Sequence, residues 1–143
     1  DVEVAKAKGM KAALLDRLAL DTKKISNMAK ELREVSSLAD PVGSIEKTWT
    51  RPNGLVIGLL RVPMGVVGVI YESRPNVTSD AAGICIKSGN AIILRGGSDA
   101  INSNVAIGEV MRDALAGTGV PADTIQVIAN PDRAAAEELM GMR

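Results

Sequence analysis

The sequence of 143 residues contains no histidine, no phenylalanine and a single cysteine. Zinc sites of the usual kind need several cysteine or histidine ligands, and a histidine-based triad needs its general base, so both are excluded within these residues. One cysteine cannot form an intrachain disulfide. We therefore expect no metal site, and any nucleophile must be Cys85, a hydroxyl, a lysine or a group outside this sequence.

The sequence also lacks the features of a nucleic-acid or membrane protein. Its 17 basic residues balance 17 acidic ones, so it has no long-range positive field to attract a polyanion. Trp49 and Tyr71 are the only aromatic residues, too few for a platform that stacks bases. Charges, prolines and glycines interrupt every apolar run before it reaches the length of a bilayer span. We expect no nucleic-acid partner, no membrane insertion and a cytoplasmic location.

The composition is that of a globular protein, with 46% hydrophobic and 24% charged residues. A chain of this length supports one domain, which buries roughly 70% of its unfolded surface. The sequence starts at Asp1 without a methionine, and its last residues continue a helical pattern up to Arg143. We therefore expect residues 1–143 to be a single partial domain.

Residues 1–53 are expected to form a helical segment. Asp21 is a candidate N-cap, and apolar residues follow it at helical spacing. These residues are Ile25, Met28, Ala29, Leu32 and Val35. The run Asp40–Gly43 then ends the helices, and a polar stretch leads to Asn53.

Residues 54–143 show repeats of strand, loop and helix. Apolar runs at 55–60, 65–71, 91–94 and 125–128 predict strands. Helical patterns follow at 79–87, from Ile101 to Leu115 and from Arg133 onward. Three such repeats at a spacing of about thirty residues predict an α/β fold with an open, doubly wound parallel sheet.

In such a sheet ligands bind at the carboxyl ends of the strands, which selects three loops. In the first, Arg74 offers a planar fork for a carboxylate or phosphate, and the Asn76 amide can donate to an oxyanion. Alternatively, Arg74 is a solvated surface residue and Asn76 only caps the next helix. The loop Asn130–Asp132 is a candidate site but is also a suitable helix start.

The remaining loop, Arg95–Ser98, joins a buried strand to a helix. Gly96 and Gly97 let backbone approach a ligand closely, and Arg95 supplies positive charge. Alternatively, the glycines serve a turn with unusual dihedral angles. No GxGxxG or Walker A motif is present, which disfavours an ordinary pyrophosphate clamp. Cys85 lies in an apolar helix without basic neighbours and is interpreted as a packing residue.

Two long runs, 61–78 and 87–98, resemble the gamma-glutamyl phosphate reductases, a family of the aldehyde dehydrogenase superfamily. Shorter matches are Leu15–Leu18, Leu38–Gly43 and Asn130–Arg133. The resemblance implies a Rossmann-like cofactor domain preceded by N-terminal helices. It also implies NADPH-dependent reduction of L-glutamyl 5-phosphate to L-glutamate 5-semialdehyde with release of phosphate, the second step of proline biosynthesis.

The resemblance also assigns roles to residues. Arg95 matches a basic residue that contacts the adenosine ribose, and Ser98 matches the residue that distinguishes a free from a phosphorylated 2′-hydroxyl. Asn76 and Arg74 match the loop on the substrate or oxyanion side. No catalytic residue is expected in this chain, because the family's nucleophilic cysteine belongs to a catalytic domain beyond Arg143. The full-length protein is expected to be a homo-oligomer. The alternative is a non-catalytic module that binds a nucleotide or another protein.

Overall fold

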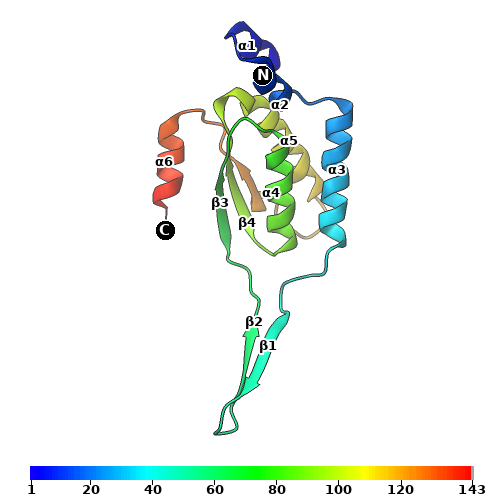
Figure 1. Cartoon of the computed structure of the whole chain (residues 1–143), viewed down its shortest axis with the longest axis vertical. Helices are drawn as coiled ribbons and strands as arrows, with labels where there is room; N and C mark the ends of the chain where they lie inside the picture. The colour runs from blue at the N-terminus through cyan, green and yellow to red at the C-terminus, as the bar shows by residue number, and fades with distance from the viewer. Residues whose placement is uncertain (143) are drawn as a thin grey trace.

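The computed structural model describes residues 1–142 and divides into an α/β core and a long β-hairpin (Figure 1). Short 3-10 turns precede α5 and β5, at Ser98–Ala100 and Ala122–Thr124. The helices and strands are, in chain order, α1 (Val2–Ala7), α2 (Ala12–Leu18), α3 (Thr22–Ser37), β1 (Ile45–Thr50), β2 (Val56–Leu60), β3 (Val66–Ile70), α4 (Asn76–Lys87), β4 (Ala91–Arg95), α5 (Ile101–Ala114), β5 (Ile125–Val127) and α6 (Arg133–Gly141).

The core contains the predicted parallel sheet, with three strands in the order β3-β4-β5. Val67 pairs with Ile92, and Ile92 pairs in turn with Ile125. Helices α4 and α5 cover one face, α3 packs outside α4, and α6 lies on the opposite face against β3 (Figure 1). This arrangement confirms the predicted α/β class with helices on both faces of a parallel sheet.

The hydrophobic core lies between the sheet and helices α4 and α5. Its buried members are Ala82, Cys85, Ile92, Leu94 and Ile125. Small residues let the helices approach closely, since a Cβ on Gly108 of α5 would come within 2.5 Å of the Val127 side chain in β5. Cys85 is buried here, as the apolar pattern around it predicts.

Helices α1 and α2 lie over the end of the core opposite the hairpin (Figure 1). Ala5 of α1, Leu18 of α2 and Ala100 before α5 form a second buried cluster. The Asp1 carboxylate also accepts hydrogen bonds from the backbone N–H of Ser103, at 2.7 Å, and from the Asn102 side chain, at 2.7 Å. These contacts fix the first two helices at the carboxyl end of the sheet.

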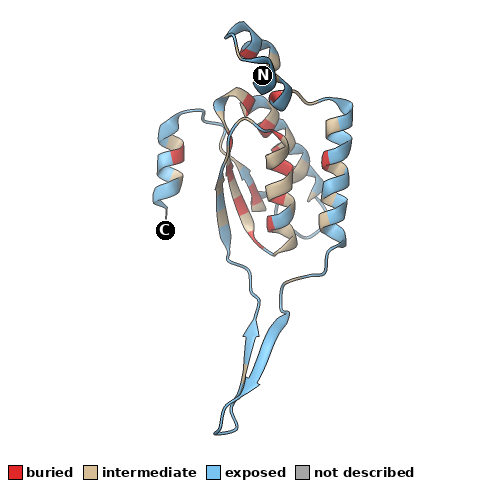
Figure 2. Cartoon of the chain, viewed as in Figure 1, coloured by how far each residue is buried: buried red, intermediate tan, exposed pale blue. Residues whose placement is uncertain are grey.

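One expectation for residues 1–53 is wrong, because this segment is not helical throughout. Helix α3 ends at Ser37, and Ile45–Thr50 form strand β1, which pairs antiparallel with β2 in a separate hairpin. Threonines and Trp49 favour a strand, and the Asn53-Gly54 pair favours a tight turn, with Gly54 at φ +84°. The hairpin lies away from the core and is almost entirely exposed (Figure 2).

Elsewhere in the chain, the observed ends of the helices agree more closely with those predicted from the sequence. Asp21 caps α3, because its side chain accepts a hydrogen bond from the Lys24 backbone N–H at 2.7 Å. Gly89 ends α4 in the left-handed conformation, with φ +73°. Helix α4 begins at Asn76 rather than at the expected Ser79, so Asn76 belongs to its first turn.

Candidate functional site

The loops after β3, β4 and β5 meet at one edge of the sheet, as the parallel topology requires. The Tyr71 N–H donates to the Arg95 carbonyl at 3.1 Å, and the Ile128 N–H donates to the Leu94 carbonyl at 2.8 Å. Backbone hydrogen bonds thus continue the ladder past the strand ends and hold the three loops side by side.

A cavity of about 370 Å³ opens between the first two loops and the N-terminal helices. We call it the strand-end cavity. It contains four of the six predicted site residues, Arg74, Arg95, Gly97 and Ser98. Its other lining residues are Met10, Leu14, Arg17, Tyr71, Glu72, Ser73 and Asp99.

Glycine is needed at positions 96 and 97 because of close packing, not because of an unusual turn conformation. Neither glycine has a positive φ, so the interpretation as a turn with unusual dihedral angles is wrong. A Cβ on Gly96 would overlap the Asn104 amide and lie 2.9 Å from the Tyr71 ring. A Cβ on Gly97 would lie 3.0 Å from the Ser73 backbone nitrogen. The pair is needed because the loop after β4 packs directly on the loop after β3.

Arg95 links two of the three loops through its guanidinium. Nη1 donates to the Gly96 carbonyl at 3.0 Å, and Nη2 donates to the carbonyls of Pro131 and Asp132 at 2.8 and 3.1 Å. Its Nε is buried and has no hydrogen-bond partner among residues 1–142. Ser98 is exposed at the rim, and within the same residues its hydroxyl makes no hydrogen bond.

The floor below Gly96 is a buried polar chain that the sequence analysis missed. The Tyr71 hydroxyl and Thr78 Oγ1 lie 2.7 Å apart, and Thr78 Oγ1 donates to Asn104 Oδ1 at 3.2 Å. Burial raises the pKa of Tyr71, although its hydrogen bond with Thr78 opposes this effect. These residues are far apart in sequence, and no local pattern connects them.

Asn76 lies outside the strand-end cavity, on a neighbouring cavity of about 460 Å³ that we call the Asn76 cavity. Its Nδ2 donates to Asp80 Oδ2 at 3.0 Å, and no side chain caps α4, so the capping interpretation is wrong. A primary amide carries two N–H groups, and the second one has no acceptor among residues 1–142. Asn76 therefore retains a donor for a ligand. The lining residues are Asp16, Arg17, Leu20, Lys24, Asn27, Met28, Glu31, Arg74 and Asn76.

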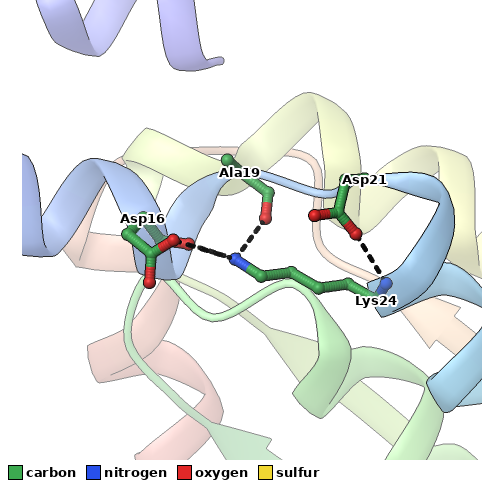
Figure 3. A network of polar contacts seen from close by, with 4 residues as sticks. All are labelled: Asp16, Ala19, Asp21 and Lys24. Atoms are coloured by element: carbon green, nitrogen blue, oxygen red, sulfur yellow. Dashed lines mark hydrogen bonds and ion pairs between the residues drawn. The ribbon is translucent and has the colours of Figure 1, made fainter.

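Lys24 fixes the wall of this cavity at the turn between α2 and α3 (Figure 3). Its Nζ donates to the carbonyls of Asp16 and Ala19, and it lies 3.6 Å from an Asp16 carboxylate oxygen. At the other end of the same residue, the Lys24 backbone N–H donates to Asp21. The ammonium is therefore held in place by contacts within the fold.

The loop Asn130–Asp132 forms a helix start, as its alternative interpretation predicts. Asn130 Oδ1 accepts from the Asp132 N–H at 2.9 Å, and Asp132 Oδ1 accepts from the Ala134 N–H at 3.0 Å. At the carboxyl end of the sheet, this loop supplies the Pro131 and Asp132 carbonyls, which accept hydrogen bonds from Arg95.

Cys85 lines neither cavity and lies on the side of α4 that faces the core. Burial raises the pKa of its thiol, which disfavours the nucleophilic thiolate. Among residues 1–142, no group of histidine, cysteine, aspartate or glutamate side chains is placed to hold a metal ion. No helix in that part of the chain is both long and apolar enough to cross a membrane.

Comparison with known proteins identifies the family. Residues 15–143 match the model of the aldehyde dehydrogenase family. The gamma-glutamyl phosphate reductase of Thermoanaerobacter sp. (strain X514) is 61% identical over 140 residues, which are 98% of this chain and 34% of that protein. This chain thus spans about a third of the length of the curated relatives it matches.

Solved structures agree with this match. The crystal structure of gamma-glutamyl phosphate reductase from Thermotoga maritima superimposes with a TM-score of 0.94 at 48% identity, covering 99% of this chain and 34% of that one. The structure of the enzyme of the same name from Saccharomyces cerevisiae superimposes with a TM-score of 0.83 at 30% identity, covering 96% of this chain and 41% of that one. The chain belongs to the aldehyde dehydrogenase family.

Proposed function

We propose that this chain is the cofactor-binding part of a gamma-glutamyl phosphate reductase. The full-length protein would use NADPH to reduce L-glutamyl 5-phosphate to L-glutamate 5-semialdehyde, releasing phosphate, in the cytoplasm as a step of proline biosynthesis. The observation that carries the proposal is the meeting of Arg95, Gly97 and Ser98, the residues expected to bind the cofactor, around one cavity at the carboxyl end of a parallel sheet. The names of the relatives supply the substrate class.

The residues of the strand-end cavity fit a phosphorylated dinucleotide. Arg95 is held at the edge by three carbonyls, has an unpartnered buried Nε and brings positive charge. Ser98 places a hydroxyl rather than a carboxylate at the rim, so no negative charge at this position repels a ribose 2′-phosphate. Gly96 and Gly97 keep the loop flat against its neighbour. When bound, the reduced nicotinamide supplies a hydride.

We assign Asn76 to the substrate carbonyl. Asn76 lines the Asn76 cavity and keeps one amide N–H without an acceptor among residues 1–142, and the hydrogen bond to Asp80 fixes the side chain's orientation in advance. A preorganised donor of this kind stabilises negative charge that develops on a carbonyl oxygen. The nucleophilic cysteine is assigned to the catalytic domain beyond Arg143, because Cys85 is buried in the core. Residues 1–143 alone are therefore expected to be inactive.

We also propose that the full-length protein is a homo-oligomer. The hairpin supports this, because its apolar side chains are uncovered in this chain: Val56 is 66% exposed and Leu59 is 51% exposed. Replacing Leu59 with Asp is expected to shift the full-length protein toward smaller species in analytical ultracentrifugation. An unchanged sedimentation profile would remove the hairpin from the interface.

The proposed activity is tested with the full-length protein in the reverse direction. Glutamate semialdehyde should reduce NADP⁺ while inorganic phosphate accepts the acyl group, and turnover should require all three. Asn76→Ala should lower kcat about a hundredfold, the usual cost of one oxyanion donor. Asn53→Ala, which removes the same side chain from the exposed hairpin turn, is the matched control and should leave kcat unchanged.

Two results would contradict the proposal. One is the absence of phosphate-dependent turnover by the unsubstituted protein. The other is an Asn76→Ala protein that is folded and as active as Asn53→Ala, which would remove Asn76 from the reaction but leave the family membership intact.

A further inference from the structure

Two arginines without partners stand on the wall between the two cavities. Arg17 comes from α2, and Arg74 comes from the loop between β3 and α4. Both side chains line both the strand-end cavity and the Asn76 cavity. Within residues 1–142, neither guanidinium makes a hydrogen bond or an ion pair. The wall thus presents two free planar cations from elements that are far apart in sequence.

The other positively charged side chains of the two cavities, Lys24 and Arg95, make hydrogen bonds within the folded chain. Lys24 donates to the carbonyls of Asp16 and Ala19 and pairs with the Asp16 carboxylate. Arg95 donates to three carbonyls of neighbouring loops. Among the cations that line the Asn76 cavity, Arg17 and Arg74 are therefore the two whose donors make no hydrogen bond within residues 1–142.

The carboxylates near the wall do not neutralise the pair. In the Asn76 cavity, Asp16 lies 3.6 Å from Lys24 Nζ. Glu31, like Asn76, lines both this cavity and a third one next to Asp80, and it forms no ion pair with either arginine. In the strand-end cavity, Glu72 and Asp99 form no ion pair with either arginine.

We infer that Arg17 and Arg74 form the subsite for the phosphoryl group of the acyl phosphate, and for inorganic phosphate in the reverse reaction. This assignment rests on the proposed function. Asn76 lines the same cavity as the pair, and the phosphoryl oxygens of an acyl phosphate are bonded next to the carbonyl that Asn76 would bind. Arginine suits this role because its planar fork donates two parallel hydrogen bonds to phosphate oxygens.

The pair would act on the leaving group. The catalytic-domain thiolate forms a C–S bond to the acyl carbon, the bond from that carbon to the phosphoryl oxygen breaks, and phosphate departs with the electron pair. Negative charge builds on the phosphate oxygens during this step, so guanidinium groups that line the same cavity stabilise it without transferring a proton. In the reverse reaction, a phosphate oxygen attacks the thioacyl carbon and the thiolate leaves.

The assignment also gives the N-terminal helices a function. The Asp1 contacts to Asn102 and Ser103 and the cluster around Leu18 hold α2 over the strand ends. The Lys24 network then fixes the turn that follows α2. Together these contacts hold Arg17 on the wall that it shares with Arg74.

The test compares Arg17→Met and Arg74→Met with Arg33→Met in the full-length protein. Arg33 is an exposed arginine of α3 that lines neither cavity, so it controls for loss of charge. Each cavity variant should raise the KM for inorganic phosphate at least about tenfold, as expected for loss of charged hydrogen bonds. The KM for NADP⁺ and for the semialdehyde should change less than about twofold, which is well below the change expected from the loss of one charged hydrogen bond.

A second measurement isolates the attack of phosphate on the thioacyl group. Mixing enzyme, semialdehyde and NADP⁺ without phosphate should give the same burst of NADPH in the variants as in the unsubstituted protein. Adding phosphate should then release the thioacyl group more slowly in Arg17→Met and Arg74→Met only. Arg17→Lys and Arg74→Lys, which keep the charge without the fork, should show intermediate phosphate KM values.

Each contrary outcome has a distinct meaning. A raised KM for the semialdehyde alone would place the substrate carboxylate at the pair, and a raised KM for NADP⁺ alone would place the 2′-phosphate there; either would overturn the assignment. An unchanged phosphate KM in active variants would overturn it while leaving the proposed function intact. If the unsubstituted protein had no turnover at all, both would fail.

Discussion

The two sheets of this protein contain similar strand residues in opposite environments. In β4, Ile92 and Leu94 are 1% and 0% exposed, whereas Val56 and Leu59 of β2 are 66% and 51% exposed. The parallel strands are covered because each crossover places a helix on a face of the sheet. The hairpin has a two-stranded antiparallel connection and gains no such cover. Topology, rather than the apolar character of a strand, decides which residues form the core.

The two ends of the parallel sheet differ as well. At the amino end the chain enters from the hairpin, and at the carboxyl end the N-terminal helices lie over the strand ends (Figure 1). The two cavities are lined there by residues of these helices and of the loops after β3 and β4. Variants of the hairpin are therefore suitable controls for variants of the core and of the strand-end loops.

The largest expected effect is on the stability of the core. Leu94→Ala should lower the free energy of unfolding by about 2 to 5 kcal/mol, because Leu94 is fully buried and its loss leaves a cavity. Leu38→Ala, the same change at a side chain after α3 that is 61% exposed, should cost less than about 0.5 kcal/mol. Urea unfolding of both full-length variants checks the difference. Equal losses would show that burial in the core does not decide the cost.

The next prediction concerns close packing at the strand ends. Gly96→Ala should cost about 1 to 3 kcal/mol, because the new methyl group would overlap Asn104 and approach the Tyr71 ring. Gly58→Ala is the control in the hairpin, where the nearest atom to the new carbon is 3.6 Å away. Thermal unfolding followed by circular dichroism compares the two. A stable Gly96→Ala protein would contradict the packing reason given for the glycine pair.

A smaller effect is expected on the choice of cofactor. Ser98→Glu should raise the KM for NADPH at least tenfold and that for NADH much less. Two like charges about 5 Å apart cost about 3 kcal/mol at an effective dielectric constant near 20, and solvent screening reduces this. Thr50→Glu adds the same charge to the hairpin and should change neither constant. Equal increases for both cofactors would remove Ser98 from the 2′-phosphate site.

The smallest expected effect is at Cys85. Cys85→Ala should cost about 1 kcal/mol, since it removes one buried sulfur atom, and should leave the chemical step intact. Because burial raises the pKa of this thiol, it stays neutral to a higher pH than an exposed cysteine and should react slowly with thiol reagents at pH 8. Loss of thioacyl-enzyme formation in a folded Cys85→Ala protein would show that Cys85 is the nucleophile.

The sequence predicts the parallel core well because its signals are local. Long apolar runs such as Ala91–Arg95, followed by glycine and a helical pattern, identify each repeat, and the carboxyl-end rule then selects the loops. Strand β1 was missed because Glu46 and Lys47 interrupt its apolar pattern and no core covers it. Its signals are threonines, Trp49 and the Asn-Gly turn, which are strong only once the partner strand is known.

Within the site, the sequence predicts the loops but not the contacts that shape them. Gly96 is required by Asn104 and Tyr71, which reach it from other elements. Arg17 was not predicted as a site residue, because its helix reaches the strand ends only through the folded arrangement of α1 and α2. Contacts between residues far apart in sequence leave no local pattern to read.

The most direct test of the account is hydrogen–deuterium exchange of the full-length protein with and without saturating NADP⁺. The central claim is that the cofactor binds at the carboxyl end of the parallel sheet. It predicts slower exchange of the backbone amides in residues 71–76 and 95–99, and no change in the hairpin, residues 45–60. Unchanged exchange in both loops, or protection of the hairpin in their place, would contradict the account.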